Sequence, residues 1–158
     1  MTIEDLKSAP MHLDTVANRI WHAWWKADGH PLEAVQAALA EIVAGTSGFP
    51  FTLVAISDGR FAGTVTAIQH DFADRPAYAP CLAALWVEPG MRGRGLGSQL
   101  MNAATERLEA GNFTHVHLGA RREMRPYYLN HGWDLVEERI GPDELDAYVR
   151  VLASRRGA

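Results

Sequence analysis

The stretch LWVEPGMRGRGLGSQL, residues 85–100, decides how the rest of the chain is organised. An apolar run reaches Pro89, and a basic, glycine-rich turn follows before an amphipathic run begins. The sequence therefore predicts a strand, a tight turn and a helix in succession. Because Gly93, Gly95 and Gly97 carry no side chain, the backbone can take unusual dihedral angles there and a ligand can approach its N–H groups closely.

This turn has the chemistry of an anion-binding site. The helix predicted over residues 98–108 directs its unpaired N–H groups and partial positive charge toward the turn. Arg92 and Arg94 add two formal charges at the same place. A pyrophosphate is therefore the expected ligand. The pattern fits neither a Rossmann fingerprint, whose third glycine is Ser98 here, nor a P-loop, which needs Gly-Lys-Ser/Thr.

Length and composition predict one globular domain over residues 1–158. A hydrophobic content of 47% and a charged content of 22% are typical of a soluble domain. The net charge of -4 argues against a general nucleic-acid binder, and no segment approaches the roughly 20 apolar residues of a membrane span. Cys81 is the only cysteine, so an intramolecular disulfide is impossible and a metal site would need other ligands. Without a basic flank and apolar core at the N-terminus, we expect a cytoplasmic protein.

Periodicity, glycines and prolines divide the chain into alternating helical and extended segments. Asp58-Gly59 is a strong hairpin signal between two strands. In chain order the predicted elements are a strand at 2–7, helices at 10–24 and 32–42, strands at 51–57, 61–69 and 81–87, a helix at 98–108, a strand at 114–119, a helix at 121–131, and strands at 133–140 and 147–153. The segments on either side of the glycine turn form a parallel βαβ unit. The fold class is α+β, with a mixed sheet flanked by helices in the order β-α-α-β-β-β-α-β-α-β-β.

Two motifs accompany this order of elements. The pattern Val-x-Pro-x-x-Arg-Gly-x-Gly-x-Gly is matched by Val87, Pro89, Arg92, Gly93, Gly95 and Gly97. Downstream, Tyr128, Gly132 and Trp133 match a tyrosine followed after three residues by glycine and an aromatic residue. Together, the motifs and the element order resemble the GNAT superfamily of acyl-CoA-dependent N-acyltransferases. The resemblance covers most of the chain and constrains the first forty or so residues least.

The resemblance implies acetyl-CoA or coenzyme A as co-substrate. The pyrophosphate-binding residues it implies are Arg92, Gly93, Arg94, Gly95, Leu96 and Gly97. The backbone groups it implies for the pantetheine arm are those of Leu85, Trp86 and Val87. The thioester would then lie between the strands predicted at 81–87 and 114–119.

Acyl transfer to an amine needs a base for the amine and a donor for the departing thiolate. Tyr128 matches the family position of that donor, and a phenol with a pKa near ~10 is protonated at neutral pH. Tyr127 is the alternative, but the spacing to Gly132 favours Tyr128. Backbone N–H groups near a bulge in the central strand would stabilise the tetrahedral oxyanion.

The base is not determined by the sequence. Many family members carry a carboxylate on the central strand, where this chain has Ala83 and Ala84. Asp71, Asp74 or His117 are alternatives, as is a water chain. For His117, which shares a strand face with another histidine, a surface or core role is favoured on general grounds.

Two further features bear on ligands. Arg121 stands where many family members have a cofactor-contacting asparagine, so Arg121 or Arg122 is an alternative phosphate contact. Trp21, Trp24 and Trp25 lie in the helices that usually flank the acceptor in this family, with core packing as the other interpretation. Adjacent residues of a helix cannot both face inward, so one of the last two should be partly exposed.

The resemblance implies an N-acetyltransferase that moves an acetyl group from acetyl-CoA to a primary amine of a small molecule or peptide, by direct attack in a ternary complex. The alternative is a non-catalytic acyl-CoA-binding sensor or scaffold. The acidic loop from Asp71 to Asp74 suits a cationic acceptor such as a polyamine or aminoglycoside. The tryptophan-rich helix suits a peptide or an aromatic amine. A homodimer through an edge strand or this helix is compatible with the sequence, and neither nucleic acid nor membrane is expected as a partner.

Overall fold

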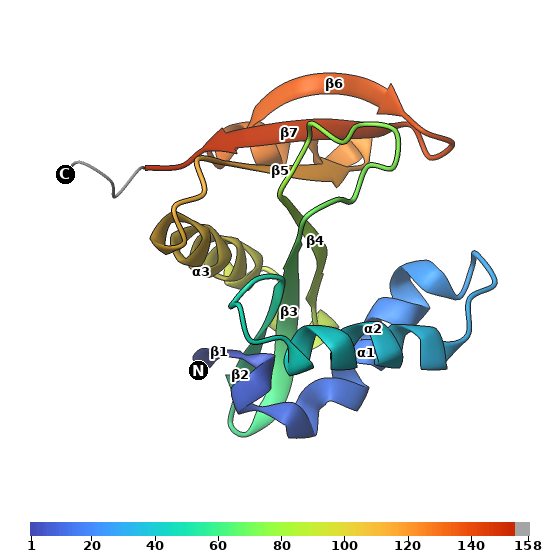
Figure 1. Cartoon of the computed structure of the whole chain (residues 1–158), viewed down its shortest axis with the longest axis vertical. Coiled ribbons are helices and arrows are strands. Elements are labelled where there is room, and N and C mark those ends of the chain that lie inside the picture. The colour runs from blue at the N-terminus through green and yellow to red at the C-terminus, as the bar shows by residue number, and fades with distance from the viewer. Residues whose placement is uncertain (154–158) are drawn as a thin grey trace. The chain divides into compact units, whose positions relative to one another are not determined.

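The computed structural model describes residues 1–153. Within them, seven strands are hydrogen-bonded in the order β1-β2-β3-β4-β5-β7-β6, and β4 runs parallel to β5. The predicted α+β class and the predicted order of strands and α-helices are confirmed (Figure 1). The domain predicted over 1–158 includes residues 154–158, which lie outside the described part of the chain.

Most element boundaries fall within a few residues of the prediction. The strands are β1 (Thr2–Asp5), β2 (Phe51–Ser57), β3 (Arg60–Ile68), β4 (Cys81–Val87), β5 (His115–Ala120), β6 (Asp134–Ile140) and β7 (Leu145–Val151). The α-helices are α1 (Leu13–Ile20), α2 (Leu32–Ala44), α3 (Leu96–Ala110) and α4 (Arg125–Asn130). None of the helices in the described residues combines the length and apolar character needed to cross a membrane.

The chain forms two compact units, which are described separately. Unit 1 comprises Met1–Ala67 and Ala84–Ala104, and unit 2 comprises Ile68–Ala83 and the chain from Thr105 onward. In unit 1, β2 and β3 form the predicted hairpin, with left-handed φ values of 52° at Asp58 and 75° at Gly59 that suit a type I′ turn. The apolar faces of α1 and α2 pack on this hairpin, and the buried side chains of their core include Val16, Ile20, Val35, Leu39 and Val54.

The first predicted helix differs from the structure. Residues Pro10–His12 form a 3-10 turn, and Trp21–Trp25 form a π-helical turn after α1. Its wider winding is visible where the Lys26 N–H donates to the Trp21 carbonyl at 2.8 Å, five residues back. Trp21 and Trp25 pack partly against the core, whereas Trp24 is 42% exposed. The expectation that the two adjacent tryptophans face differently is confirmed.

In unit 2, β7 lies between β5 and β6, and both pairs are antiparallel. Residues paired in register share a face of a sheet, and successive residues alternate between faces. Leu118 pairs with Tyr148, and the Tyr148 ring lies 5.2 Å from the ring of Tyr128 in α4. We call this side the α4 face.

The opposite side of the same strands carries His117 and Gly119. A Cβ atom on Gly119 would lie 2.9 Å from the ring of Phe72, which belongs to the loop between β3 and β4. Phe72 is part of a small apolar cluster with Cys81 and Ala147, and Tyr78 packs against it. We call this side the loop face, and residues 69–80 the 69–80 loop.

Candidate active site

The glycine turn of unit 1 has the geometry expected of an anion-binding site. Gly93 and Gly95 both have φ of 77°, which favours glycine, and the space beside them is open because a Cβ at either position would meet no atom within 4 Å. The helix α3 begins directly afterwards at Leu96, two residues earlier than predicted. Its first N–H groups have no intrahelical acceptor, so the helix N-terminus can donate to an anion over the turn.

The two arginines of the turn are exposed, and each contacts a neighbouring residue of the chain. Arg92 Nε donates to the Val87 carbonyl at 2.9 Å, and its guanidinium carbon lies 4.7 Å from the centre of the Trp86 ring. This is a cation–π contact that holds Arg92 beside β4. Arg94 Nη1 lies 4.0 Å from the sulfur of Met91. Both guanidinium groups therefore belong to the immediate surroundings of the turn.

The strand before the turn has two unusual features. Ala84 adopts a left-handed φ of 54°, which costs an alanine on the order of 1 kcal/mol or more and interrupts the regular strand. The indole Nε1 of Trp86 is a fully buried donor without a hydrogen-bond acceptor among the described residues. Leu85, Trp86 and Val87 are all partly buried. Strain and an unsatisfied donor are features that often accompany a functional site.

Tyr128 lies on the α4 face of unit 2 and is 7% exposed. The rings of Tyr127, Trp133 and Tyr148 surround it, at centroid distances of 5.2, 6.4 and 5.2 Å. Burial, followed by the neighbouring tyrosines, raises the pKa of Tyr128 to about 12. Its hydroxyl is therefore protonated at neutral pH and makes no hydrogen bond to another described residue. A protonated phenol without a partner is suited to donate a proton.

The three base candidates have different surroundings. Asp74 is exposed, and its carbonyl rather than its carboxylate accepts a hydrogen bond from Arg75. Asp71 is also exposed as a residue, although partial burial of its carboxyl group raises its pKa. His117 is 8% exposed, and burial lowers its pKa below 6.5. By the exposure of the whole residue, His117 is the most buried of the three.

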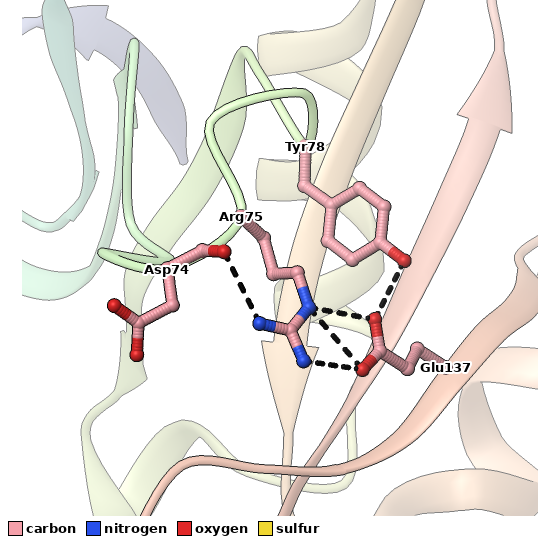
Figure 2. Close-up of polar contacts among 4 residues, drawn as sticks. All are labelled: Asp74, Arg75, Tyr78 and Glu137. Atoms are coloured by element: carbon pink, nitrogen blue, oxygen red, sulfur yellow. Dashed lines mark hydrogen bonds and ion pairs between the residues drawn. The ribbon is translucent and has the colours of Figure 1, made fainter.

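Figure 2 shows a polar network that fixes the 69–80 loop to β6. The guanidinium of Arg75 donates to both carboxylate oxygens of Glu137, with Nη2–Oε2 at 2.7 Å and Nε–Oε1 at 2.9 Å. The Tyr78 hydroxyl donates to Glu137 Oε1 at 2.8 Å. These contacts lower the pKa of Glu137 to about 2, and the hydrogen bond from Arg75 is the largest cause. The carboxylate therefore stays ionised over the physiological range and keeps both partners.

Arg121 and Arg122 occupy the connection between β5 and α4. Together with the turn between β6 and β7, they line a pocket of about 390 Å³ whose walls are all charged residues. Asp146 also lines this pocket; it is 2% exposed and accepts two hydrogen bonds of 2.9 Å from Arg125. The two exposed arginines are therefore on the surface of this pocket in unit 2.

The predicted site residues fall into both units. The turn from Arg92 to Gly97 and the strand residues Leu85, Trp86 and Val87 belong to unit 1, whereas Tyr128, His117 and Asp71 belong to unit 2. Sequence reasoning did not identify Tyr78 or Glu137. They are 59 residues apart and belong to no recognisable motif. The left-handed conformation of Ala84 also has no local signal, since alanine is not a turn residue.

Comparison with known families identifies the class of protein. Residues 14–133 match the model described as "Acetyltransferase (GNAT) family", so the chain belongs to the GNAT acetyltransferase family. No curated protein sequence matches the chain significantly.

Similar solved structures agree on the fold. An aminoglycoside 6'-N-acetyltransferase complexed with coenzyme A is 15% identical, with a TM-score of 0.76 over 98% of this chain and 99% of that chain. The acetyltransferase yncA of Salmonella typhimurium, described as putative and solved with acetyl-CoA, is 14% identical, with a TM-score of 0.74 over 100% of this chain and 97% of that one. A GNAT acetyltransferase from Streptococcus pneumoniae is 18% identical, with a TM-score of 0.71 over 96% and 99% of the two chains. At these identities the likeness establishes the fold alone.

Proposed function

We propose that the protein transfers an acetyl group from acetyl-CoA to a primary amine of a small molecule or peptide, by direct attack in a ternary complex. The observation that carries this proposal is Tyr128. It is a buried phenol with a pKa of about 12 and a hydroxyl that has no acceptor among the described residues. Family membership and the open glycine turn are consistent with this role.

Each part of this reaction is assigned to residues of the chain. The turn from Arg92 to Gly97, with Leu96 opening α3, binds the pyrophosphate of coenzyme A through backbone N–H groups, and Arg92 and Arg94 add charge. The backbone of residues 85–87 flanks the pantetheine arm. The irregular backbone at Ala84 supplies an N–H donor for the oxyanion. Tyr128 protonates the departing thiolate.

Two features of the chain bear on the class of the acceptor. One of the solved structures with this fold is an aminoglycoside 6'-N-acetyltransferase. A cationic amine, such as a polyamine or aminoglycoside, also suits the acidic residues Asp71 and Asp74 of the 69–80 loop. Trp24, the exposed tryptophan of the π-helical turn, favours a peptide or aromatic amine instead. A thiol-release screen across both amine classes separates these possibilities.

Tyr128→Phe tests the catalytic assignment. The variant keeps the ring packing and removes the proton donor, so we expect kcat to fall by about 10²-fold or more while the KM for acetyl-CoA stays within about twofold. Tyr127→Phe is the matched control and should leave kcat within a small factor. Unchanged turnover in Tyr128→Phe would refute the assignment. If the protein binds acetyl-CoA but releases no coenzyme A thiol in the presence of any amine tested, the acyl-CoA sensor is favoured instead.

A further inference from the structure

We propose that His117 is the group that takes the proton from the attacking amine, and that Tyr78, held by Glu137 and Arg75, is the positioning residue that covers its imidazole ring. The proposal rests on the acetyl transfer proposed above. It extends that function to a residue pair that lies outside both sequence motifs described above. All four side chains belong to unit 2, so the contacts among them lie within that unit.

The orientation of the His117 ring is set from two sides. Its Nδ1 lies 3.4 Å from the Pro80 carbonyl, an acceptor that favours the tautomer with the proton on Nδ1. The backbone N–H of His117 donates to the same carbonyl at 2.8 Å. Nε2 then carries the lone pair, and it has no hydrogen-bond partner in the described chain. A lone pair on a fixed ring is what a general base requires.

Tyr78 forms the cover of this ring. The phenol stacks on the imidazole with centroids 5.4 Å apart and planes inclined by 18°. Its hydroxyl donates at the same time to Glu137, whose two carboxylate oxygens also accept hydrogen bonds from Arg75 (Figure 2). The stack therefore has little freedom to open. Because the ring is covered, its charged form is disfavoured and the imidazole is neutral at pH 7.

The groups that face His117 from each packed element are few. Cys81 of β4 and Val149 of β7 are its register partners, and both are uncharged at pH 7, since burial raises the pKa of Cys81 to about 11. Tyr78 faces it from the 69–80 loop. His115 of the same strand is the nearby titratable group that lowers its pKa further. No carboxylate among these groups would hold His117 in its charged form.

His117 and Tyr128 lie on opposite faces of β5. The base is on the loop face with Gly119, whereas the acid is on the α4 face with Leu118 and Tyr148. The register pair between β4 and β5 in the described chain joins Cys81 to His117, so the base stands at the site where these two strands meet. The proposal therefore places the base and the acid on opposite faces of β5.

The proton and electron balance of the step is complete. His117 Nε2 accepts a proton from the ammonium group, and the nitrogen lone pair forms the C–N bond with the acetyl carbonyl. The C–S bond breaks with its electron pair on sulfur, which takes the Tyr128 proton. The second nitrogen proton returns through solvent to the tyrosinate, and His117 releases its proton to solvent. One acetyl group is transferred and one proton is released overall.

Two nucleophiles of nearly equal size provide the test. Methylamine is an ammonium ion at pH 7 and needs a base, whereas hydroxylamine is already neutral. We expect His117→Gln to lower kcat/KM for methylamine by about 10²-fold or more at pH 7, and for hydroxylamine by less than about tenfold. His115→Gln, on the same strand, is the matched control and should change neither rate by more than a small factor. Thermal unfolding of each variant checks that it is folded.

The role of Tyr78 in covering the His117 ring can be tested without measuring turnover. We expect NMR titration of the His117 ring to give a pKa below 6.5 in the wild type and a higher value in Tyr78→Leu, with Glu137→Gln in between. The acid limb of kcat/KM for methylamine should move upward in parallel. Tyr78→Phe, which keeps the stack and loses only the bond to Glu137, should move it least.

The outcomes separate this proposal from the proposed function. Equal losses with both nucleophiles in His117→Gln, or loss of methylamine transfer in Asp71→Asn alone, would overturn the base assignment while transfer itself stands. A His117 pKa at or above 6.5 in the wild type overturns the cover. Failure of the wild type to acetylate either nucleophile removes the base role together with the proposed function.

Discussion

Burial acts in opposite directions on the two titratable side chains that we place in the chemistry. It raises the pKa of Tyr128 to about 12 and lowers the pKa of His117 below its ordinary 6.5, because desolvation disfavours the phenolate and the imidazolium alike. Both groups are consequently neutral at pH 7. Burial therefore keeps the phenol in its proton-donating form and the imidazole in its proton-accepting form, while it makes the phenol a weaker acid and the imidazole a weaker base.

A buried carboxylate gives a residue-scale prediction about stability. Asp146 is 2% exposed and is bound by Arg125 and by the Tyr148 hydroxyl, at 3.2 Å for the latter. Asp146→Asn should lower the free energy of unfolding at pH 7 by about 2–3 kcal/mol. This is less than the ~3–5 kcal/mol of a fully buried pair, because Arg125 retains its ion pair with Glu138.

The pH dependence of this loss has a definite sign. Arg125, the main cause, lowers the pKa of Asp146 in the folded protein below 3.8, so the carboxylate stabilises the fold above that pH and its contribution disappears as the pH falls. Urea unfolding between pH 7 and pH 3 should therefore show the difference between wild type and variant shrinking at low pH. Asp143→Asn, an exposed residue of the same pocket, is the control. A difference that grows on acidification would contradict the prediction.

At the scale of elements, a close approach in unit 1 depends on a glycine. A Cβ atom on Gly63 of β3 would lie 2.9 Å from the Trp86 carbonyl of β4 and 3.0 Å from Leu100 of α3. Backbone cannot yield as a flexible side chain can, so Gly63→Ala should destabilise the protein by about 1–3 kcal/mol. Gly90→Ala is the matched control, because its Cβ would meet nothing within 4 Å. Chemical denaturation measures both, and equal stabilities would show that β3 and β4 can separate at no cost.

Elements were predictable from sequence where one local rule decides them. The hairpin at Asp58-Gly59, the apolar strand β4 and the glycine turn all follow from turn chemistry or from an uninterrupted apolar run. The π-helical turn at Trp21–Trp25 was not predicted, because apolar spacing does not distinguish a hydrogen bond to the fifth preceding residue from one to the fourth.

The candidate site divides along the same line. Tyr128 and the turn from Arg92 to Gly97 lie within short motifs, so the sequence alone predicts them as site residues. The sequence does not determine the base because its surroundings are assembled from distant segments. His117 acquires its cover from Tyr78, and Tyr78 is held by Glu137 on another strand. No spacing within the sequence encodes a contact of that kind.

At the scale of the whole molecule, three continuous elements contribute to both units, although β3 has only its last residue, Ile68, in unit 2. Strand β4 has residues 81–83 in unit 2 and 84–87 in unit 1, and α3 is divided in the same way after Ala104. Melting either element removes part of both units. We therefore expect the two units to unfold in one cooperative transition.

Aromatic residues allow each unit to be followed separately in one protein. Four tryptophans, Trp21, Trp24, Trp25 and Trp86, lie in unit 1, and Trp133 lies in unit 2 together with all 4 tyrosines. In Trp133→Phe labelled with fluorotyrosine, tryptophan fluorescence reports on unit 1 and fluorine NMR on unit 2. The two melting curves should coincide.

Acetyl-CoA at 100 times its Kd should stabilise the fold by about 2.7 kcal/mol. It should shift both curves upward together by roughly 5–10 °C, although its predicted pyrophosphate contacts lie in unit 1 alone. Two separated transitions, or a shift confined to the tryptophan signal, would show that β4 and α3 do not couple the units.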